Sequence, residues 1–286
     1  MSAGTGHASA AGADRRNVVA VAVTAIHGGA ARTRRDLLAA EEPLEIRTVG
    51  PGQEPAAVAV TMRTPGHDFE LAAGFLLTEG LLRAGDIATI TYCQEPNEQR
   101  YNIVNVHTRV PLDLSAAERT FFTTSSCGIC GKASLDAVAV RCDPLDPAGP
   151  VVERATVLGL PGALRDRQRI FGRTGGLHAA GLFTTSGELT VMREDIGRHN
   201  AVDKVVGATV LAAGPPRGEV LLVSGRLSFE IVQKAAVAGI PLVCAISAPS
   251  SLAVQAAGEL GVTAVGFLRP EGFNVYTHPQ RIAAGA

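Results

Sequence analysis

The chain has 286 residues, of which 46% are hydrophobic and 19% charged, a composition typical of a globular enzyme or carrier. Its formal net charge of −1 excludes the broad basic field that attracts nucleic acids or anionic membranes. Five cysteines are an odd number, and a chain of this length buries enough surface to fold without disulfides. The composition therefore indicates a reducing compartment and no disulfide scaffold.

The chain contains two segments that resemble targeting or membrane sequences. Residues 1–16 are rich in Gly, Ala and Ser without a hydrophobic period, which predicts a disordered tail. Arg15 and Arg16 precede an apolar run, as in a twin-arginine export signal, but the run is short and β-branched, so we expect a first strand at 18–26. Residues 235–258 carry no formal charge, yet their prolines and serines favour a buried strand, a turn and a helix. We therefore expect no transmembrane segment and no membrane partner.

Residues 17–114 have the pattern of a small α+β domain. The segment 69–82 places apolar residues at helical spacing and has a glycine near its end. Short β-branched or alternating runs predict the strands of this domain, at 18–26, 41–47, 57–62, 87–92 and 101–107.

Residues 115–286 alternate between helical and strand patterns, which predicts an α/β domain with helices over a mixed sheet. The apolar run 219–223 is typical of a strand buried on both faces. The other strands are expected at 179–184, 188–192, 241–246 and, as the last one, 264–268. Helices are expected at 134–140, 161–171, 201–213, 229–238 and 252–260. The predicted fold class is therefore α/β, with an α+β N-terminal domain.

The stretch TTSSCGICGKAS, residues 123–134, contains the closely spaced cysteines Cys127 and Cys130. A thiol at the start of a helix ionises more readily, because the helix amides and dipole favour negative charge there. Lys132 adds a positive charge, and the neighbouring glycines keep the sulfurs accessible. The pattern indicates thiol chemistry, and it leaves open whether the pair carries sulfur or exchanges electrons as a dithiol.

A zinc site is the other class of site that a C-x-x-C motif suggests. A structural zinc needs four ligands, usually from a second C-x-x-C or from two closely spaced histidines. Cys142 and Cys244 stand alone, and no two histidines have that spacing. A deaminase-type catalytic zinc requires H-x-E and P-C-x-x-C, but the sequence has no H-x-E, and Ser126 stands where the proline is needed. We therefore expect no metal.

The charged stretch REDIGRHNAVDK, residues 193–204, precedes an apolar helix. It forms either a solvated helix start with Asn200 as the N-cap or a site for a polar ligand. Its candidate residues are Asp195, Arg198, His199, Asn200, Asp203 and Lys204. His178 follows two glycines in TGGLHAA, where a single histidine is more often a satisfied core residue.

Small polar residues follow two of the expected strands. Ser224, Gly225 and Arg226 come directly after 219–223, at the strand end where α/β sheets bind ligands. Such residues can hold a phosphate at the N-terminus of the next helix. The stretch SAPSSLAV, residues 247–254, repeats the arrangement one strand later. Together the two strand ends predict a site for an extended, phosphate-bearing ligand.

Several of these stretches together resemble the formate dehydrogenase accessory sulfurtransferase family, FdhD. The resemblance runs in order from Glu41 to Tyr276 through EEPLEIR, MRTPGHDFELAAGFLLTEG, TSSCGICGK, TGGLHAA, REDIGRHNAVDK, SGRLSFE, SAPSSLAV and GFLR. It implies a cytoplasmic sulfurtransferase that takes sulfur from a cysteine desulfurase and passes it to the molybdenum cofactor, bis-molybdopterin guanine dinucleotide. The cofactor is then inserted into formate dehydrogenase. The resemblance also implies a cytidine-deaminase-like second domain without zinc, and a homodimer.

The resemblance further assigns roles to residues of this chain. The persulfide-bearing cysteine falls on Cys127, and Cys130 either resolves the persulfide or tunes Cys127. Arg198, His199, Arg226 and Lys234 are the candidates for contacts with the guanine nucleotide ends. The cofactor-binding stretch of the family falls on Phe267, Leu268, Arg269, Pro270, Glu271 and Gly272. A C-x-x-C dithiol oxidoreductase and a zinc-dependent deaminase-like hydrolase are the alternative functions.

Overall fold

The computed structural model describes residues 17–93, 101–112, 142–146, 148–212 and 220–283. The tail expected at 1–16, the helix expected at 134–140 and the pair Cys127 and Cys130 lie outside the described residues.

The N-terminal part contains a four-stranded sheet covered by one helix. The strand order is β4-β3-β6-β5, and β3 and β6 run parallel. Helix α1, Asp68–Thr78, packs Leu71 and Leu76 against Leu44 and Val104 of the sheet, and all four side chains are fully buried. The strands are β3 (Glu42–Val49), β4 (Ala56–Arg63), β5 (Ile87–Tyr92) and β6 (Ile103–Thr108), with a short 3-10 turn, η1 (Ala84–Asp86), before β5.

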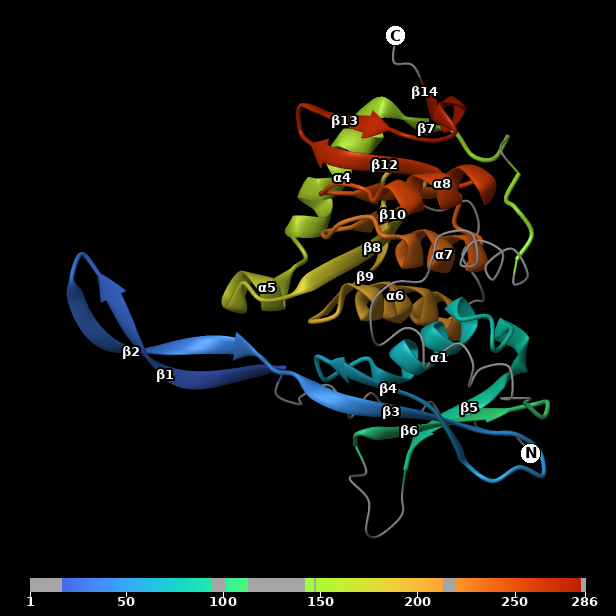
Figure 1. Ribbon diagram of the computed structural model, residues 1–286, viewed down its shortest axis with the longest axis horizontal. Coiled ribbons are helices and arrows are strands. Elements are labelled where there is room, and N and C mark those ends of the chain that lie inside the picture. Colours follow the sequence, from blue (N-terminus) through green and yellow to red (C-terminus); the bar gives the residue numbers. More distant parts are fainter. Residues whose placement is uncertain (1–16, 94–100, 113–141, 147, 213–219, 284–286) are drawn as a thin grey trace, which may run out of the picture.

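The C-terminal part is built on a six-stranded sheet of order β13-β12-β11-β10-β8-β9 (Figure 1). Strands β10, β11 and β12 are parallel, and β8, β9 and β13 are antiparallel to their neighbours. The predicted α/β fold with a mixed sheet is confirmed. The strands are β8 (His178–Phe183), β9 (Leu189–Asp195), β10 (Val220–Val223), β11 (Leu242–Ala245), β12 (Thr263–Arg269) and β13 (Gly272–Val275).

Helices cover both faces of this sheet, as the alternation of its apolar side chains requires. In β10, Val220 and Leu222 face the core that contains α4, whereas Leu221 and Val223 face the core that contains the helices of the other side. The helices are α4 (Arg154–Arg165) and α5 (Arg169–Thr174), then α6 (Arg198–Ala212), α7 (Phe229–Val237) and α8 (Ser251–Glu259). Outside the sheet, β7 (Val152–Glu153) pairs with β14 (Ile282–Ala283) after the 3-10 turn η2 (Pro279–Arg281).

Several expected boundaries are wrong. The strand at 264–268 is not the last one, because β13 and β14 follow it. The helix expected at 161–171 is two helices, α4 and α5, separated by a turn. Asn200 is not an N-cap: α6 begins at Arg198, and the buried Asn200 amide donates to the carbonyl oxygen of Met62 at 2.8 Å.

The first expected strand is one strand of a β-hairpin that the sequence pattern did not reveal. Strand β1, Val18–His27, pairs antiparallel with β2, Ala30–Ala39, through a turn at Gly28 and Gly29. Both glycines have positive φ, 55° and 81°, as a two-residue hairpin turn requires. This hairpin, which we call the arm, extends away from the body of the molecule (Figure 1).

The two parts of the chain meet where α1 crosses α6. A Cβ atom on Gly74 would overlap the carbonyl oxygen of Asp203, and one on Gly207 would overlap that of Glu70. The two helices therefore approach backbone to backbone, a separation that only glycine permits at these points. The N-terminal sheet is attached to the rest of the protein through this crossing.

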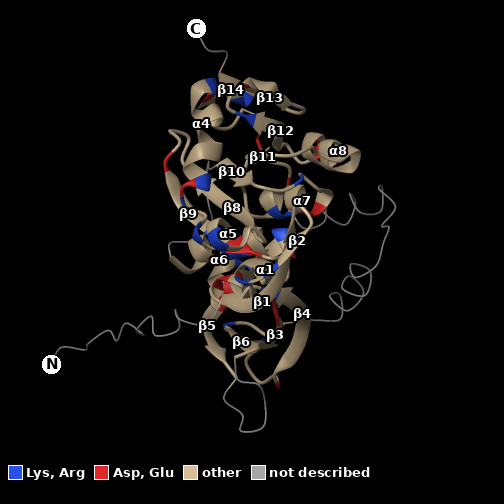
Figure 2. Cartoon of the chain, turned by 90° about the vertical axis from the view of Figure 1, so that its left-hand side faces the viewer, with Lys and Arg blue, Asp and Glu red and all other residues tan. Residues whose placement is uncertain are grey.

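Buried ion pairs surround the crossing, and Figure 2 shows basic and acidic residues lying together where α1 meets α6. The Lys234 ammonium of α7 lies 2.9 Å from carboxylate oxygens of both Asp203 and Glu79. The Lys204 ammonium lies 2.6 Å from the Asp195 carboxylate and donates to the carbonyl oxygen of Thr64 at 2.8 Å. Removing one member leaves a buried charge without its partner, so these pairs fix how the helices fit together.

No helix among the described residues combines the length and the apolar composition that crossing a bilayer demands.

The glycine crossing predicts a large effect from one methyl group. Gly74→Ala is expected to lower the free energy of unfolding by about 1–3 kcal/mol or more, because the helices must separate to admit the Cβ. Gly159→Ala, in α4, is the matched control, because a Cβ there has open space and alanine favours a helix. Urea unfolding of both variants measures the difference. Equal stabilities of the two variants would contradict the backbone contact.

Glu70 of α1 binds Arg193 of β9, and we expect this contact to contribute to the free energy of unfolding in a pH-dependent way. Burial raises the pKa of Glu70, but hydrogen bonds from Arg193 and His67 overcome this effect and hold the pKa at about 2. The pKa of Glu70 is lower in the folded state than in the unfolded state. The stabilisation of the fold by the Glu70 carboxylate is therefore complete above about pH 5 and is lost as the pH falls toward 2.

Glu70→Gln is therefore expected to lower the free energy of unfolding by about 1–3 kcal/mol at pH 7. The difference from wild type should shrink as the pH falls toward the Glu70 pKa of about 2. The exposed Glu188→Gln serves as the control and should change little at any pH. Urea unfolding at several pH values measures both, and a difference that does not vary with pH would contradict this assignment.

Candidate functional site

One edge of the six-stranded sheet gathers the polar residues that the sequence singled out. The parallel strands β10 and β11 end there, and the antiparallel strand β8 begins there, so that Val223 of β10 lies opposite Ala180 of β8. His178 at the start of β8 lies opposite Asp195 at the end of β9. The mixed sheet therefore brings loops from distant parts of the sequence to one place.

The loops that follow β10 and β11 are fixed to each other by backbone hydrogen bonds. The Leu227 amide donates to the carbonyl oxygen of Ala248 at 3.2 Å, and the Ser250 amide donates to that of Leu227 at 3.0 Å. The Ser224 hydroxyl accepts a hydrogen bond from the Ala179 amide at 2.9 Å, which joins the first loop to β8. These bonds hold the two strand ends in one arrangement before any ligand binds.

Arg198 provides the positive charge at this edge. It is the first residue of α6, and its Nε is buried without a hydrogen-bond partner in the described part of the chain. A Cβ on Gly225 would lie 3.4 Å from Nδ1 of His178 and 3.9 Å from Cδ of Arg198, so the glycine backbone lies against both side chains. A buried guanidinium N–H without an acceptor is a group that an anionic ligand would satisfy.

Two histidines flank Arg198, and both are neutral at pH 7. Burial lowers the pKa of His178, and the charge of Arg198 lowers it further. Burial also lowers the pKa of His199 to about 4, with Arg198 and Lys234 acting in the same direction. The His199 ring lies 3.4 Å from the Ser228 hydroxyl and 3.8 Å from the Glu230 carboxylate, between α6 and α7.

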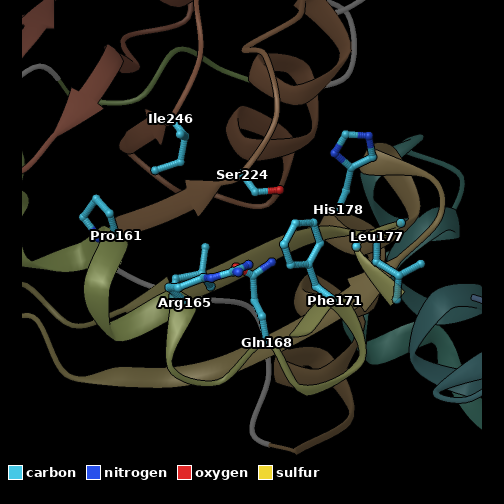
Figure 3. A pocket seen from close by; sticks show the side chains of 11 residues that line it. Pro161, Arg165, Gln168, Phe171, Leu177, His178, Ser224 and Ile246 are labelled. Atoms are coloured by element: carbon cyan, nitrogen blue, oxygen red, sulfur yellow. The ribbon is translucent and has the colours of Figure 1, made fainter. Parts of the chain in front are cut away.

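A cavity of about 570 Å³ adjoins this cluster, and Figure 3 shows the side chains around it. His178 and Ser224 contribute its polar side, and the Arg165 guanidinium lies 4.4 Å from the centre of the Phe171 ring. Its apolar wall comes from Pro161, Leu164, Phe171, Leu177 and Ile246. The volume and the mixed lining are those of a site for a small organic ligand or for one end of a larger ligand.

The wall formed by α4 and α5 is the part of the site that sequence reasoning missed. Arg165, Gln168 and Phe171 line the cavity, yet of the lining residues only Ser224, His178 and the glycines before His178 stand out in the sequence. One sequence signal could have identified this wall: an aromatic residue stands among arginines directly before the glycine pair, in RIFGRTGG.

The stretch assigned by resemblance, Phe267 to Gly272, is the end of β12, a turn and the start of β13. Phe267 is 47% exposed, has a left-handed φ of 53°, and its amide donates to the carbonyl oxygen of Ser247 at 3.1 Å. A shift in strand register at this position turns the ring outward, as bulges beside functional sites do. Leu268 is buried in the core, and the Arg269 guanidinium donates to the carbonyl oxygen of Ile246. Pro270 and Glu271 form the exposed turn.

The remaining predicted residues separate into two groups. Arg226 is exposed on the loop after β10, beside Gly225. Lys234 is not at the strand ends: it is buried between α7, α1 and α6, where carboxylates of Asp203 and Glu79 outweigh burial and raise its pKa. Its charge is already neutralised, so its position is that of a structural residue.

Within the described part of the chain, no three His, Cys, Asp or Glu side chains gather closely enough to hold a metal ion.

The fold and this edge define an α/β protein with a polar site at the strand ends of a mixed sheet. The chain belongs to the FdhD/NarQ family, whose model matches residues 39–283. The matched residues begin at the last residue of β2, so the arm precedes nearly all of them.

Curated relatives cover most of the chain. A protein of Streptomyces avermitilis named sulfur carrier protein FdhD is 52% identical over 282 residues, which is 96% of each chain. The protein of the same name from Mycobacterium tuberculosis is 50% identical and covers 87% of this chain and 93% of its own. A crystal structure described as a formate dehydrogenase accessory protein, from Desulfotalea psychrophila, has 26% identity and a TM-score of 0.73, covering 93% of this chain and 99% of that one.

The unpaired Arg198 predicts an anion site that a simple probe detects. Wild-type protein is expected to bind inorganic diphosphate, and Arg198→Gln should weaken the affinity about tenfold or more, since a charge-assisted hydrogen bond contributes about 1.5–3 kcal/mol. Arg154→Gln, an exposed arginine of α4, is the matched control and should bind as wild type does. Isothermal titration calorimetry measures all three. Equal affinities in the two variants would show that Arg198 does not form the site.

Proposed function

We propose that this protein is a sulfur carrier that loads sulfur onto the molybdenum cofactor for formate dehydrogenase. Cys127 accepts sulfur from the persulfide of a cysteine desulfurase and passes it to the bis-molybdopterin guanine dinucleotide form of the cofactor, in the cytoplasm. Membership of the FdhD/NarQ family and the names of the curated relatives support the sulfur-carrying role. The solved accessory protein supports formate dehydrogenase as the enzyme served.

The observation that carries the cofactor part of the proposal is the Arg198 Nε, which has no acceptor among the described residues and lies near His178, a residue that lines the cavity. A guanine nucleotide end offers a planar base and a diphosphate. The Phe171 ring on the cavity wall is a surface on which a base can stack, and the diphosphate would satisfy the arginine. About 570 Å³ holds one nucleotide end and not the whole cofactor, so the molybdenum end extends beyond the cavity.

Sulfur acceptance is a thiol–persulfide exchange. The Cys127 thiolate attacks the outer sulfur of the desulfurase persulfide, a new S–S bond forms on Cys127, and the desulfurase cysteine leaves as a thiolate. Cys130 then acts as the resolving thiol: it attacks the Cys127 sulfur, releases the outer sulfur as hydrosulfide for the cofactor, and forms a Cys127–Cys130 disulfide. A cellular thiol reductant restores the pair.

Mass spectrometry of the intact protein tests the proposal after incubation with a cysteine desulfurase and L-cysteine. Wild type is expected to carry one extra sulfur atom on Cys127 transiently and to end as the Cys127–Cys130 disulfide with hydrosulfide released, and Cys127→Ala should gain none. Cys130→Ala, the matched control, should accumulate the adduct, because it cannot release the sulfur. An adduct that persists in Cys127→Ala would overturn the assignment. A Cys127–Cys130 disulfide in wild type, with no hydrosulfide released and no adduct in Cys130→Ala, would instead identify a dithiol oxidoreductase.

A further inference from the structure

Arg165 is a cation on the cavity wall whose charge no described side chain neutralises. It is the last residue of α4, it is exposed, and it lines the cavity. Its guanidinium lies 4.4 Å from the centre of the Phe171 ring, and among the described residues it has no ion pair and no side-chain hydrogen bond. The contact with the ring is therefore the interaction that holds this charged group.

The Phe171 ring is fixed more firmly than the guanidinium that covers it. The Glu194 carboxylate of β9 accepts hydrogen bonds from the Ile170 and Phe171 amides at 3.0 and 2.7 Å, which attaches α5 to the sheet. A cation–π contact of an exposed arginine is weak, and holding a long side chain in one position costs conformational entropy. A ligand can therefore displace the guanidinium while the ring stays in place.

The guanidinium occupies the place where a base would stack. Arg165 and Phe171 line the same cavity, so the covered face of the ring is the one that a ligand in the cavity approaches (Figure 3). A guanidinium is planar and stacks on an aromatic ring as a base does. No other Phe, Tyr or Trp is among the described residues that line the cavity. A base that stacks here must therefore take the place of Arg165.

We propose that Arg165 is a displaceable cover of the Phe171 ring, and that this cover makes the cavity select a whole nucleotide over its separate parts. In the free protein the guanidinium lies on the ring. When a nucleotide binds, its base replaces the guanidinium on the ring, and the displaced guanidinium pairs with the phosphates. The inference rests on the cofactor part of the proposed function, in which a guanine nucleotide end enters this cavity.

The displaced guanidinium finds its strongest acceptor on the ligand. The described residues that line the cavity include no Asp or Glu, and their polar side chains besides Arg165 are those of Gln168, His178 and Ser224. The Glu194 carboxylate is engaged by the α5 amides. An arginine stays charged and pairs with phosphate oxygens through charge-assisted hydrogen bonds. The phosphates of a nucleotide are therefore the group that Arg165 binds once it leaves the ring.

The two parts of a nucleotide differ in what they offer to Arg165. A nucleoside must displace the guanidinium and offers it no phosphate in return. Inorganic diphosphate offers the phosphate but leaves the ring without a base. A nucleotide offers both, so the new charge-assisted hydrogen bonds offset the loss of the ring contact. We therefore expect Arg165 to oppose the binding of a nucleoside and to favour the binding of a nucleotide.

Arg165→Ala tests this cover, because it should change the affinities for guanosine and GDP in opposite directions. Guanosine is expected to bind about two- to fivefold more tightly than to wild type, since its base no longer competes with the guanidinium. GDP is expected to bind about threefold or more weakly, since the lost charge-assisted hydrogen bonds outweigh the freed ring. NMR titration measures the guanosine affinity, and isothermal titration calorimetry measures the GDP affinity. A damaged fold would weaken both.

Two further variants separate the cover from general effects of charge and volume. Arg167→Ala removes the same charge from an exposed position that is not among the residues lining the cavity, so both affinities should stay at the wild-type value. Phe171→Leu keeps an apolar side chain but removes the ring, and it should weaken guanosine and GDP alike, about threefold or more.

The position of the guanidinium is tested directly by the NMR signal of the Arg165 Nε–H proton. A proton above an aromatic ring is shifted upfield by the ring current, so this signal should lie upfield in the free protein and should lose that position in Phe171→Leu. Guanosine should remove the upfield shift from wild type as its base replaces the guanidinium on the ring.

Four results would overturn the proposal. One is Arg165→Ala changing both affinities in the same direction or changing neither. Another is guanosine that binds neither wild type nor Arg165→Ala. The third is guanosine binding to wild type with the upfield shift intact. These three leave the proposed function standing where wild type binds GDP, whereas a wild type that binds no GDP would overturn its cofactor part as well.

Discussion

The backbone contact between α1 and α6 is the constraint on which the arrangement of this molecule depends. Gly74 and Gly207 leave no side chain between the helices, so the distance between them is set by the main chain alone. The four-stranded sheet is attached through α1, and Arg198 occupies the first position of α6. A change in this contact would therefore shift the small sheet and the charged end of the site together.

The charged groups around α6 fall into two groups: ion pairs that hold the fold, and Arg198, whose buried Nε has no acceptor in the described part of the chain. Asp195 links the two groups. Its carboxylate binds the Lys204 ammonium at 2.6 Å and accepts a hydrogen bond from the Gly197 amide at 2.8 Å, directly before Arg198. The ion pair thus fixes the turn from which α6 starts. Among the described residues, Arg198 keeps an unsatisfied N–H, whereas the Asp195 carboxylate is paired with Lys204 and that of Asp203 with Lys234.

The sequence predicted those elements whose signal is local. Apolar runs identified β10 and β11, and the small polar residues after them identified the strand-end loops. Strand β2 was missed because its arginines give no strand pattern, and it is ordered by pairing with β1. The sequence alone suggests a ligand contact for Lys234, because its partners, Glu79 and Asp203, are distant in sequence. The α5 wall of the cavity is missed for the same reason: only the fold brings Phe171 to the same cavity as Ser224, which follows β10.

Arg198 and the two histidines near it differ in what they offer to a ligand: the arginine offers charge, and the histidines offer hydrogen bonds. An arginine stays charged across the physiological range, whereas a histidine with an ordinary pKa would gain and lose charge within it. Burial and the neighbouring arginine keep His178 and His199 neutral, with the pKa of His199 at about 4. A neutral imidazole still donates one hydrogen bond and accepts another. The two histidines therefore offer hydrogen bonds of defined direction without adding charge.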